Sequence, residues 1–186
     1  CKLLIATSNW LKMNHSATAN EIIEVTQEEL SRASLQKTPQ EVLAVFVQPS
    51  YDLNPEVIKS SLCLALDDVQ DPGNLGTIIR LADWFGIEHI FCSTGTADVY
   101  NPKTVQATMG ALARVKVHYC SLPQLIESLT DIPVYGTFLN GNIIYTESLS
   151  AHGLIVMGNE GKGVSLEVEK LINNKLYIPN YPQERE

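Results

Sequence analysis

The chain has 186 residues, of which 45% are hydrophobic and 18% are charged. A chain of this length can form one full domain with a sizeable core and part of a second, and the composition is typical of a globular protein. Its 21 acidic residues outnumber the 13 lysines and arginines, so the formal net charge is −8. Indiscriminate binding to nucleic acid needs a broad cationic surface. The negative net charge therefore argues against such indiscriminate binding but is compatible with a local basic patch.

The sequence shows no targeting segment and no metal-ligand spacing. No apolar run approaches the roughly 20 residues that span a bilayer, and the first residues lack the layout of a signal peptide. The four histidines are scattered, and no two cysteines form a C-x-x-C pair. We therefore expect a cytoplasmic protein with reduced, mostly buried thiols, no metal and no membrane contact. Because no Met begins the chain, we also expect it to be part of a longer protein.

The first part of the chain predicts a small mixed α/β unit. A short strand is expected over residues 22–25. Thr26 and Glu29 then form a capping box in front of a helix. After a break at a Thr-Pro pair, the apolar run over residues 42–47 predicts a buried strand.

The stretch from Leu62 to Arg80 is the one around which we expect the fold to be organised. Residues 62–66 form a short apolar run, which is typical of a strand buried in a parallel sheet. Turn residues follow, and Asn74 is a suitable N-cap for a helix that runs to Gly86. Arg80 lies on another face of that helix, beside the strand-to-helix turn. Ligands bind at the carboxyl ends of parallel strands, so this turn is a candidate site.

The rest of the chain alternates between strand and helix patterns. Asn101 caps the second helix, whose apolar positions are taken to be Val105, Met109 and Leu112. Such alternation predicts an α/β fold with a parallel sheet and helices on both faces, and by itself it favours a Rossmann-like open sheet. The remaining strands are expected at residues 90–92, 115–119, 134–138, 153–157 and 175–178, and the remaining helices at 122–129 and 165–172.

Three motifs, in order, resemble those of the SpoU-type (TrmH family) RNA ribose methyltransferases. The first is Asn74-x-Gly76-x-x-x-Arg80, the second runs over residues 155–165, and the third opens at residues 177–180. The first motif alone is weak, but three ordered matches within one domain-sized span are specific. The resemblance covers residues 62–186.

A fainter resemblance precedes these motifs. Residues 34–45 resemble the end of the small RNA-binding domain that comes before many SpoU-type catalytic domains. We therefore expect a partial N-terminal substrate-binding domain over residues 1–49, a linker over 50–61 and a methyltransferase domain over 62–186. A plain α/β lobe without a role in binding is the alternative for the first of these.

The resemblance implies a fold and an activity that periodicity cannot reveal. The fold is the SPOUT class, in which the carboxyl-terminal segment forms a trefoil knot. The activity is methyl transfer from S-adenosylmethionine to a ribose 2′-hydroxyl of ribosomal or transfer RNA, by a homodimer. A non-catalytic RNA-binding protein on the same scaffold is the main alternative. A dinucleotide oxidoreductase is disfavoured, because no G-x-G-x-x-G follows an early strand.

The same resemblance assigns catalytic roles to Arg80, Asn74 and Glu160. Guanidinium groups stay protonated at neutral pH, so we expect Arg80 to grip a phosphate and stabilise negative charge instead of acting as a base. Asn74 would contact the ribose or the arginine, and Glu160, in a glycine-rich turn, would orient one of them. The structural alternatives are a surface arginine, a simple helix cap and an exposed loop glutamate.

Cofactor contacts are expected from backbone and apolar groups in three loops. Without the resemblance, Leu139 and Ile178 would be assigned to the core. The third motif departs from the family pattern after Pro179, and we expect the natural protein to continue past Glu186 with a Ser-Leu-Asn-Val segment and a helix. The positions that match the family's cofactor loops are Gly136, Thr137, Leu139, Gly158, Asn159, Gly163 and Ile178.

Overall fold

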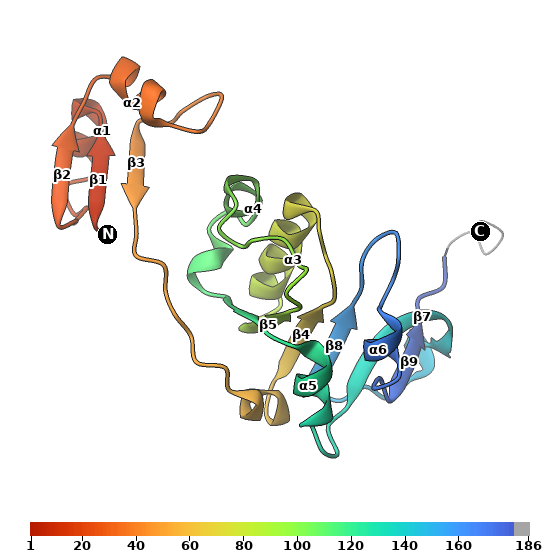
Figure 1. The fold of residues 1–186 in the computed structure, drawn as a ribbon. Helices are drawn as coiled ribbons and strands as arrows, with labels where there is room; N and C mark the ends of the chain where they lie inside the picture. Colours follow the sequence, from red (N-terminus) through yellow and green to blue (C-terminus); the bar gives the residue numbers. More distant parts are fainter. Residues whose placement is uncertain (181–186) are drawn as a thin grey trace. The chain divides into compact units, whose positions relative to one another are not determined.

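The computed structural model describes residues 1–180 of the chain. These residues form two compact units, Cys1–Ser50 and a larger one that begins at Tyr51, and each is described by itself (Figure 1). Within residues 1–180, no helix is both long and apolar enough to cross a membrane.

The first unit is a three-stranded sheet with two short helices. The strand order is β2-β1-β3, with β1 parallel to β2 and antiparallel to β3. The expected capping box is confirmed, because Thr26 Oγ1 accepts from the Glu29 N–H and the Glu29 carboxylate accepts from the Thr26 N–H. The elements are β1 (Leu3–Ala6), α1 (Ser8–Met13), β2 (Glu21–Glu24), α2 (Gln27–Ala33) and β3 (Val42–Val45).

The prediction of a buried strand over residues 42–47 is wrong in two respects. The strand ends at Val45, and its residues are half-buried or exposed. An edge strand of a small sheet pairs on one side only, so an apolar sequence does not by itself bring burial on both faces. The first strand, β1, was not predicted at all, although it is the central strand of this sheet.

The second unit is built on a six-stranded sheet in the order β6-β5-β4-β8-β7-β9, and each neighbouring pair is parallel, as predicted (Figure 1). Its strands are β4 (Leu62–Leu66), β5 (His89–Cys92), β6 (Lys116–Tyr119), β7 (Val134–Ile143), β8 (Gly153–Met157) and β9 (Asn174–Tyr177). Its helices are η1 (Pro55–Lys59), α3 (Pro72–Trp84), α4 (Pro102–Ala107), η2 (Ala111–Ala113), α5 (Leu122–Glu127), η3 (Ile144–Thr146) and α6 (Leu166–Glu169), the last much shorter than expected.

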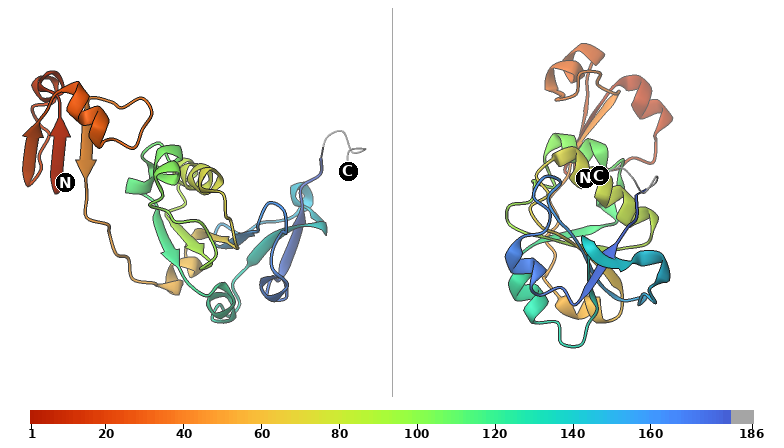
Figure 2. Two further views of the ribbon diagram at one scale, coloured as in Figure 1. Left: turned by 45° about the horizontal axis from the view of Figure 1, so that its top comes forward. Right: turned by 90° about the vertical axis from the view of Figure 1, so that its right-hand side faces the viewer.

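Helices cover both faces of this sheet. Along β4, Cys63 and Ala65 pack into a core with α5 and α6, while Leu64 and Leu66 pack into another with α3 and η2 (Figure 2). Both sets are buried, which explains why the strand is apolar without alternation. Ile58 of η1 is fully buried in the first core, so the second half of the expected linker belongs to this unit.

Helix α3 begins three residues earlier than the sequence indicated, and its cap is Asp71, not Asn74. The Asp71 carboxylate accepts from the Asn74 backbone N–H at 2.9 Å, and Pro72 occupies the first helical turn, where its missing N–H costs nothing. The correction matters for function, because the Asn74 side chain is left free for another contact.

Helix α4 presents a different face to the core than its apolar residues suggested. Val105 and Met109 are exposed, and Met109 has a φ of +50° just beyond the helix end. The face toward α3 carries Thr104 and Ala107 instead. A Cβ on Gly76 of α3 would lie 2.5 Å from the Ala107 Cβ, so only small side chains fit between these two helices.

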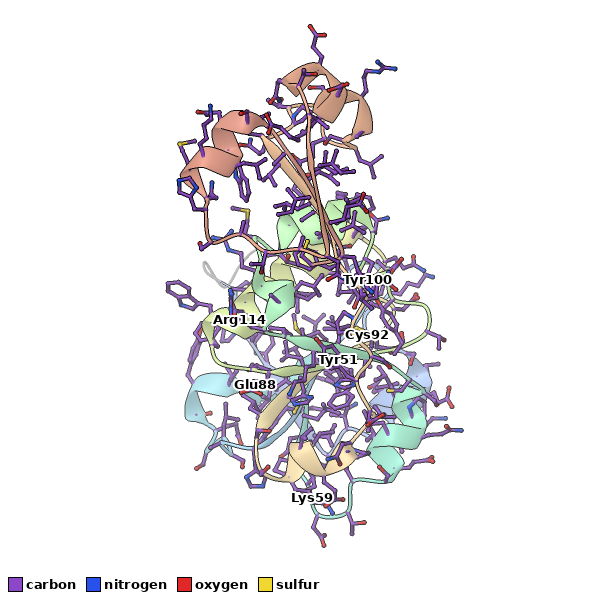
Figure 3. All side chains as sticks on the ribbon, turned by 90° about the vertical axis from the view of Figure 1, so that its left-hand side faces the viewer. Tyr51, Lys59, Glu88, Cys92, Tyr100 and Arg114 are labelled. Carbon is purple, nitrogen blue, oxygen red and sulfur yellow. The ribbon has the colours of Figure 1, made fainter. Side chains whose placement is uncertain are left out.

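A cluster of rings lies on strands β5 and β6. His89 Nδ1 and His118 Nε2 are 3.1 Å apart, and the two imidazoles are stacked. His118 is buried, stacks on Phe91 and meets the edge of Tyr51, which is labelled in Figure 3. Burial lowers the pKa of both histidines, and the nearby Lys116 ammonium lowers it further.

We expect this pair to make the protein less stable in mild acid. The unfolded chain binds these protons more readily than the folded one, so the free energy of unfolding should fall as the pH drops below about 6.5. A His118→Phe variant keeps an aromatic ring in the stack and removes one of the two titratable imidazoles. Urea unfolding across this pH range should show a smaller pH dependence for the variant. An equal dependence would contradict the assignment.

Candidate active site

The first two motifs meet at the carboxyl edge of the sheet. β4 and β8 are neighbours, and their last residues, Leu66 and Met157, are paired. The turn after β4 leads into α3, and the loop after β8 carries the glycine-rich motif. The Asn74 Nδ2 donates to Glu160 Oε2 at 3.1 Å, so two of the three predicted catalytic residues are in contact.

Two cavities lie beside this contact. One of about 390 Å³ is lined mostly by polar residues and opens beside the start of α3. A smaller one of about 190 Å³ lies between the first turns of α3 and the end of β8. Both are lined by Val69, Asn74 and Glu160. The larger is completed by Gln70, Asp71, Asn159 and Gly161, and the smaller by Thr77, Ile78, Met157 and Gly158.

An apolar cavity of about 380 Å³ lies next to them. Four predicted cofactor positions line it, namely Gly136, Thr137, Gly158 and Ile178. It shares Met157 and Gly158 with the smaller cavity, which also contacts the Asn74 and Glu160 side chains, so the apolar cavity adjoins the Asn74–Glu160 pair. Its size and apolar walls with a few polar groups are those of small-molecule pockets. The residues that sequence reasoning missed are Leu62, Tyr135, Ile144, Leu149, Ser150, Ile155, Met157 and Leu176.

Three predicted cofactor positions lie elsewhere. Leu139 is 93% exposed and does not line the apolar cavity. Asn159 lines the larger polar cavity instead. Gly163 shapes the loop after β8, with a φ of +71° that favours glycine. The part of the third cofactor loop beyond Asn180 lies outside the described residues.

The loop over residues 158–164, here called the glycine loop, folds back on itself. Asn159 and Gly163 exchange two backbone hydrogen bonds of 2.9 and 2.8 Å. A Cβ on Gly158 would lie 2.3 Å from both the Gly163 carbonyl carbon and the Val164 nitrogen. Backbone therefore packs directly on backbone at the point where the loop borders the apolar cavity.

Arg80 does not join the Asn74–Glu160 pair and lines none of the three cavities described above. It lies six residues further along α3, a rise of about 9 Å, and is exposed. Among the described residues, no hydrogen bond or ion pair engages its guanidinium. Lys103, by contrast, donates to Asp71 at 2.9 Å, and this bond holds the pKa of the Asp71 carboxyl below its ordinary value.

Within residues 1–180, no three His, Cys, Asp or Glu side chains are grouped so that they could hold a metal ion. The four cysteines are free, with Cys63 and Cys92 buried. Burial raises the pKa of the Cys92 thiol to about 12, which makes it unreactive.

Comparison with known proteins points to one family. A model of the SpoU rRNA Methylase family matches residues 61–185. The 23S rRNA (guanosine(2553)-2′-O)-methyltransferase RlmP of Bacillus subtilis is 33% identical over 162 residues, which make up 86% of this chain and 64% of that enzyme. The chain thus spans less than two thirds of the length of this relative.

Solved structures of related proteins can be superposed along the whole length of this chain. A protein from Porphyromonas gingivalis assigned to the TrmH family of RNA methyltransferases is 41% identical, with a TM-score of 0.89 and 76% of its chain covered. The SpoU methyltransferase AviRb from Streptomyces viridochromogenes, in complex with AdoMet, is 25% identical, with a TM-score of 0.83 and 76% covered. The parallel sheet with its helices is therefore that of the SpoU/SPOUT methyltransferases. The chain belongs to the SpoU rRNA methylase family.

Two glycines of the glycine loop allow a matched test of its packing. Gly158→Ala forces a Cβ into backbone, and we expect the free energy of unfolding to fall by about 1–3 kcal/mol. Binding of S-adenosylmethionine, measured by calorimetry, should weaken with it. In Gly161→Ala the nearest atom to the new Cβ is 3.7 Å away, so both quantities should stay close to wild type. Equal losses in the two variants would contradict the packing argument.

Proposed function

We propose that the chain is the catalytic part of an S-adenosylmethionine-dependent RNA 2′-O-methyltransferase that acts on ribosomal or transfer RNA in the cytosol. The observation that carries the proposal is the Asn74–Glu160 hydrogen bond at the carboxyl edge of the sheet, next to the apolar cavity. Support also comes from relatives of the family, such as the ribosomal RNA 2′-O-methyltransferase of Bacillus subtilis. A structural neighbour bound to AdoMet supports the choice of cofactor.

The apolar cavity is the compartment that fits the cofactor. Its aliphatic walls suit an adenine ring, and the glycines at positions 136 and 158 allow backbone N–H and C=O groups to come close to a ligand. Ile178 and Leu176 would lie against the ring, and Thr137 would offer a hydroxyl. When bound, S-adenosylmethionine supplies an electrophilic methyl group on a sulfonium. Gly158 borders both this cavity and the smaller one beside Asn74 and Glu160, where we place the acceptor ribose.

The three predicted catalytic residues would divide the work on the acceptor. Asn74 and Glu160, already in contact, would hold and orient the ribose hydroxyls by hydrogen bonds. Arg80 would bind the adjoining phosphate through its guanidinium fork and stabilise the negative charge that develops on the attacking oxygen. Holding the reacting groups at near-attack distance lowers the barrier by removing the entropy cost of their encounter.

We also propose the finer features that the family resemblance implies. The segment that leads to β9 would pass through the knot of the SPOUT class. The strand order, with β8 inserted between β4 and β7, is compatible with that arrangement. Residues 1–50 would be part of an RNA-selecting domain that precedes the catalytic one.

We expect Arg80→Ala to abolish methylation with little change in cofactor affinity, because Arg80 does not line the apolar cavity. Arg80→Lys should also fail, since a point charge cannot reproduce a bidentate fork. Transfer of radiolabelled methyl to unmodified transcribed 23S rRNA or tRNA measures the first quantity, and calorimetry the second. Arg114→Ala is the matched control, because Arg114 is already paired with Asp83. Equal loss of cofactor binding and activity in Arg80→Ala would contradict this division of roles.

We further propose a homodimer that covers the apolar surface at the end of α3. Leu81, Trp84 and Phe85 are 50%, 84% and 73% exposed there. Figures 1 and 2 show α3 and α4 side by side. Light scattering of the full-length protein at micromolar concentration should give a dimer, and Trp84→Asp should shift it to a monomer. Leu35→Asp, at an exposed leucine of the first unit, should not. A monomeric wild type would overturn the proposal.

A further inference from the structure

Two side chains without a role in the proposed reaction, Asn159 and Asp67, hold the glycine loop in place by hydrogen bonds. Asn159 uses its whole amide for this purpose. Its Oδ1 accepts from the backbone N–H groups of Gly161 and Lys162 at 2.9 and 3.0 Å, which closes the turn around Glu160. Its Nδ2 donates to the Asp68 carbonyl at 2.8 Å, which ties the turn to the end of β4.

A second tie comes from the other end of the loop. Asp67 is buried, with 6% of its surface exposed, and its Oδ2 accepts from the Ser165 backbone N–H at 2.7 Å. A hydrogen bond to a carboxylate at this distance is of the stronger, charge-assisted kind. The two residues are 98 positions apart in sequence, so the contact joins the end of β4 to the end of the second motif.

We infer that Asp67 and Asn159 are positioning residues that fix the glycine loop in the shape that presents Glu160 to Asn74. The inference rests on the proposed function, in which the Asn74–Glu160 pair orients the acceptor ribose. It also gives Asn159 a role different from the cofactor contact expected from the sequence, because its side-chain oxygen and nitrogen are both engaged within the protein.

The loop needs such ties because of its composition. Three of its seven residues are glycine, and glycine loses more backbone freedom on ordering than any other residue. The Asn159–Gly163 backbone bonds are internal, so they close the loop without attaching it to the sheet. The bonds to Asp67 and Asp68 supply that attachment, one on each side of Glu160.

Conservative substitutions separate the parts of this arrangement. Asn159→Asp keeps an oxygen to accept from Gly161 and Lys162 but replaces the donor that faces the Asp68 carbonyl. Asp67→Asn keeps an acceptor for the Ser165 N–H, whereas Asp67→Ala removes it. Lys162→Ala is a control in the same loop: its backbone takes part in the turn, and its 77% exposed side chain makes only a long ion pair of 4.0 Å with Asp68, which contributes little at the surface.

Amide hydrogen exchange on the free protein tests the ties without any reaction. We expect Asn159→Asp and Asp67→Ala to speed exchange over residues 158–165 by about tenfold, as loss of a buried hydrogen bond implies, with the β4 core unaffected. Asp67→Asn and Lys162→Ala should stay near wild type. Unchanged exchange in Asn159→Asp would overturn the inference. Acceleration across the whole second unit would also overturn it, because that result describes a general loss of stability.

A double-mutant cycle tests whether the ties act through Glu160. In the methyl-transfer assay with unmodified transcribed 23S rRNA, Asn159→Asp should lower kcat by about tenfold and leave the KM for RNA within about twofold. In a Glu160→Ala background, the same substitution should change kcat by less than about twofold, because the group that it positions is gone. Independent effects in the cycle would overturn the inference. Full activity of Glu160→Ala alone would overturn the proposed function, while the exchange result would still stand.

Discussion

The parallel pairing of β4 with β8 is the constraint on which the rest of the second unit depends. The register runs from Leu62 opposite Gly153 to Leu66 opposite Met157, and the Asp67 N–H extends it with a bond to the Met157 carbonyl. Both strands therefore end at the same level. The turn into α3 and the glycine loop consequently emerge side by side, and every contact of the candidate site between the two motifs follows from that placement.

The site divides its tasks between backbone and side chains. The apolar cavity is bordered by glycines and aliphatic groups, which offer shape and main-chain hydrogen bonds. The larger of the two cavities beside Asn74 is bordered by amide and carboxylate groups, of which Asn74 and Glu160 are already paired with each other. The basic side chains of this unit also differ in whether they are paired with a carboxylate. Lys103 and Arg114 are paired with aspartates, whereas the exposed guanidinium of Arg80 has no ion-pair partner within residues 1–180. An acidic protein can thus present positive charge where a phosphate would need it.

Most strands of the second unit could be predicted from the sequence, and the predictions that were wrong have physical explanations. Short apolar runs located β4, β5 and β8 because strands buried on both faces need them. The face of α4 was wrong, because a helical period does not tell which side meets a close neighbour such as Gly76. The cap of α3 was wrong because Asp71 and Asn74 are both good caps. The family resemblance named Asn74 and Glu160 as site residues but did not predict the bond between them, since no local pattern links residues 86 positions apart.

The pairing of β4 with β8 also has a consequence for how the chain is made. The Asp68 and Asn159 partners are separated by 91 residues, and β5, β6 and β7 all lie between them in sequence. On a ribosome that adds roughly 5–20 residues per second, the strand edge that receives β8 stays open for on the order of ten seconds. During that interval the nascent chain carries an apolar, unpaired edge that a chaperone or another chain can reach.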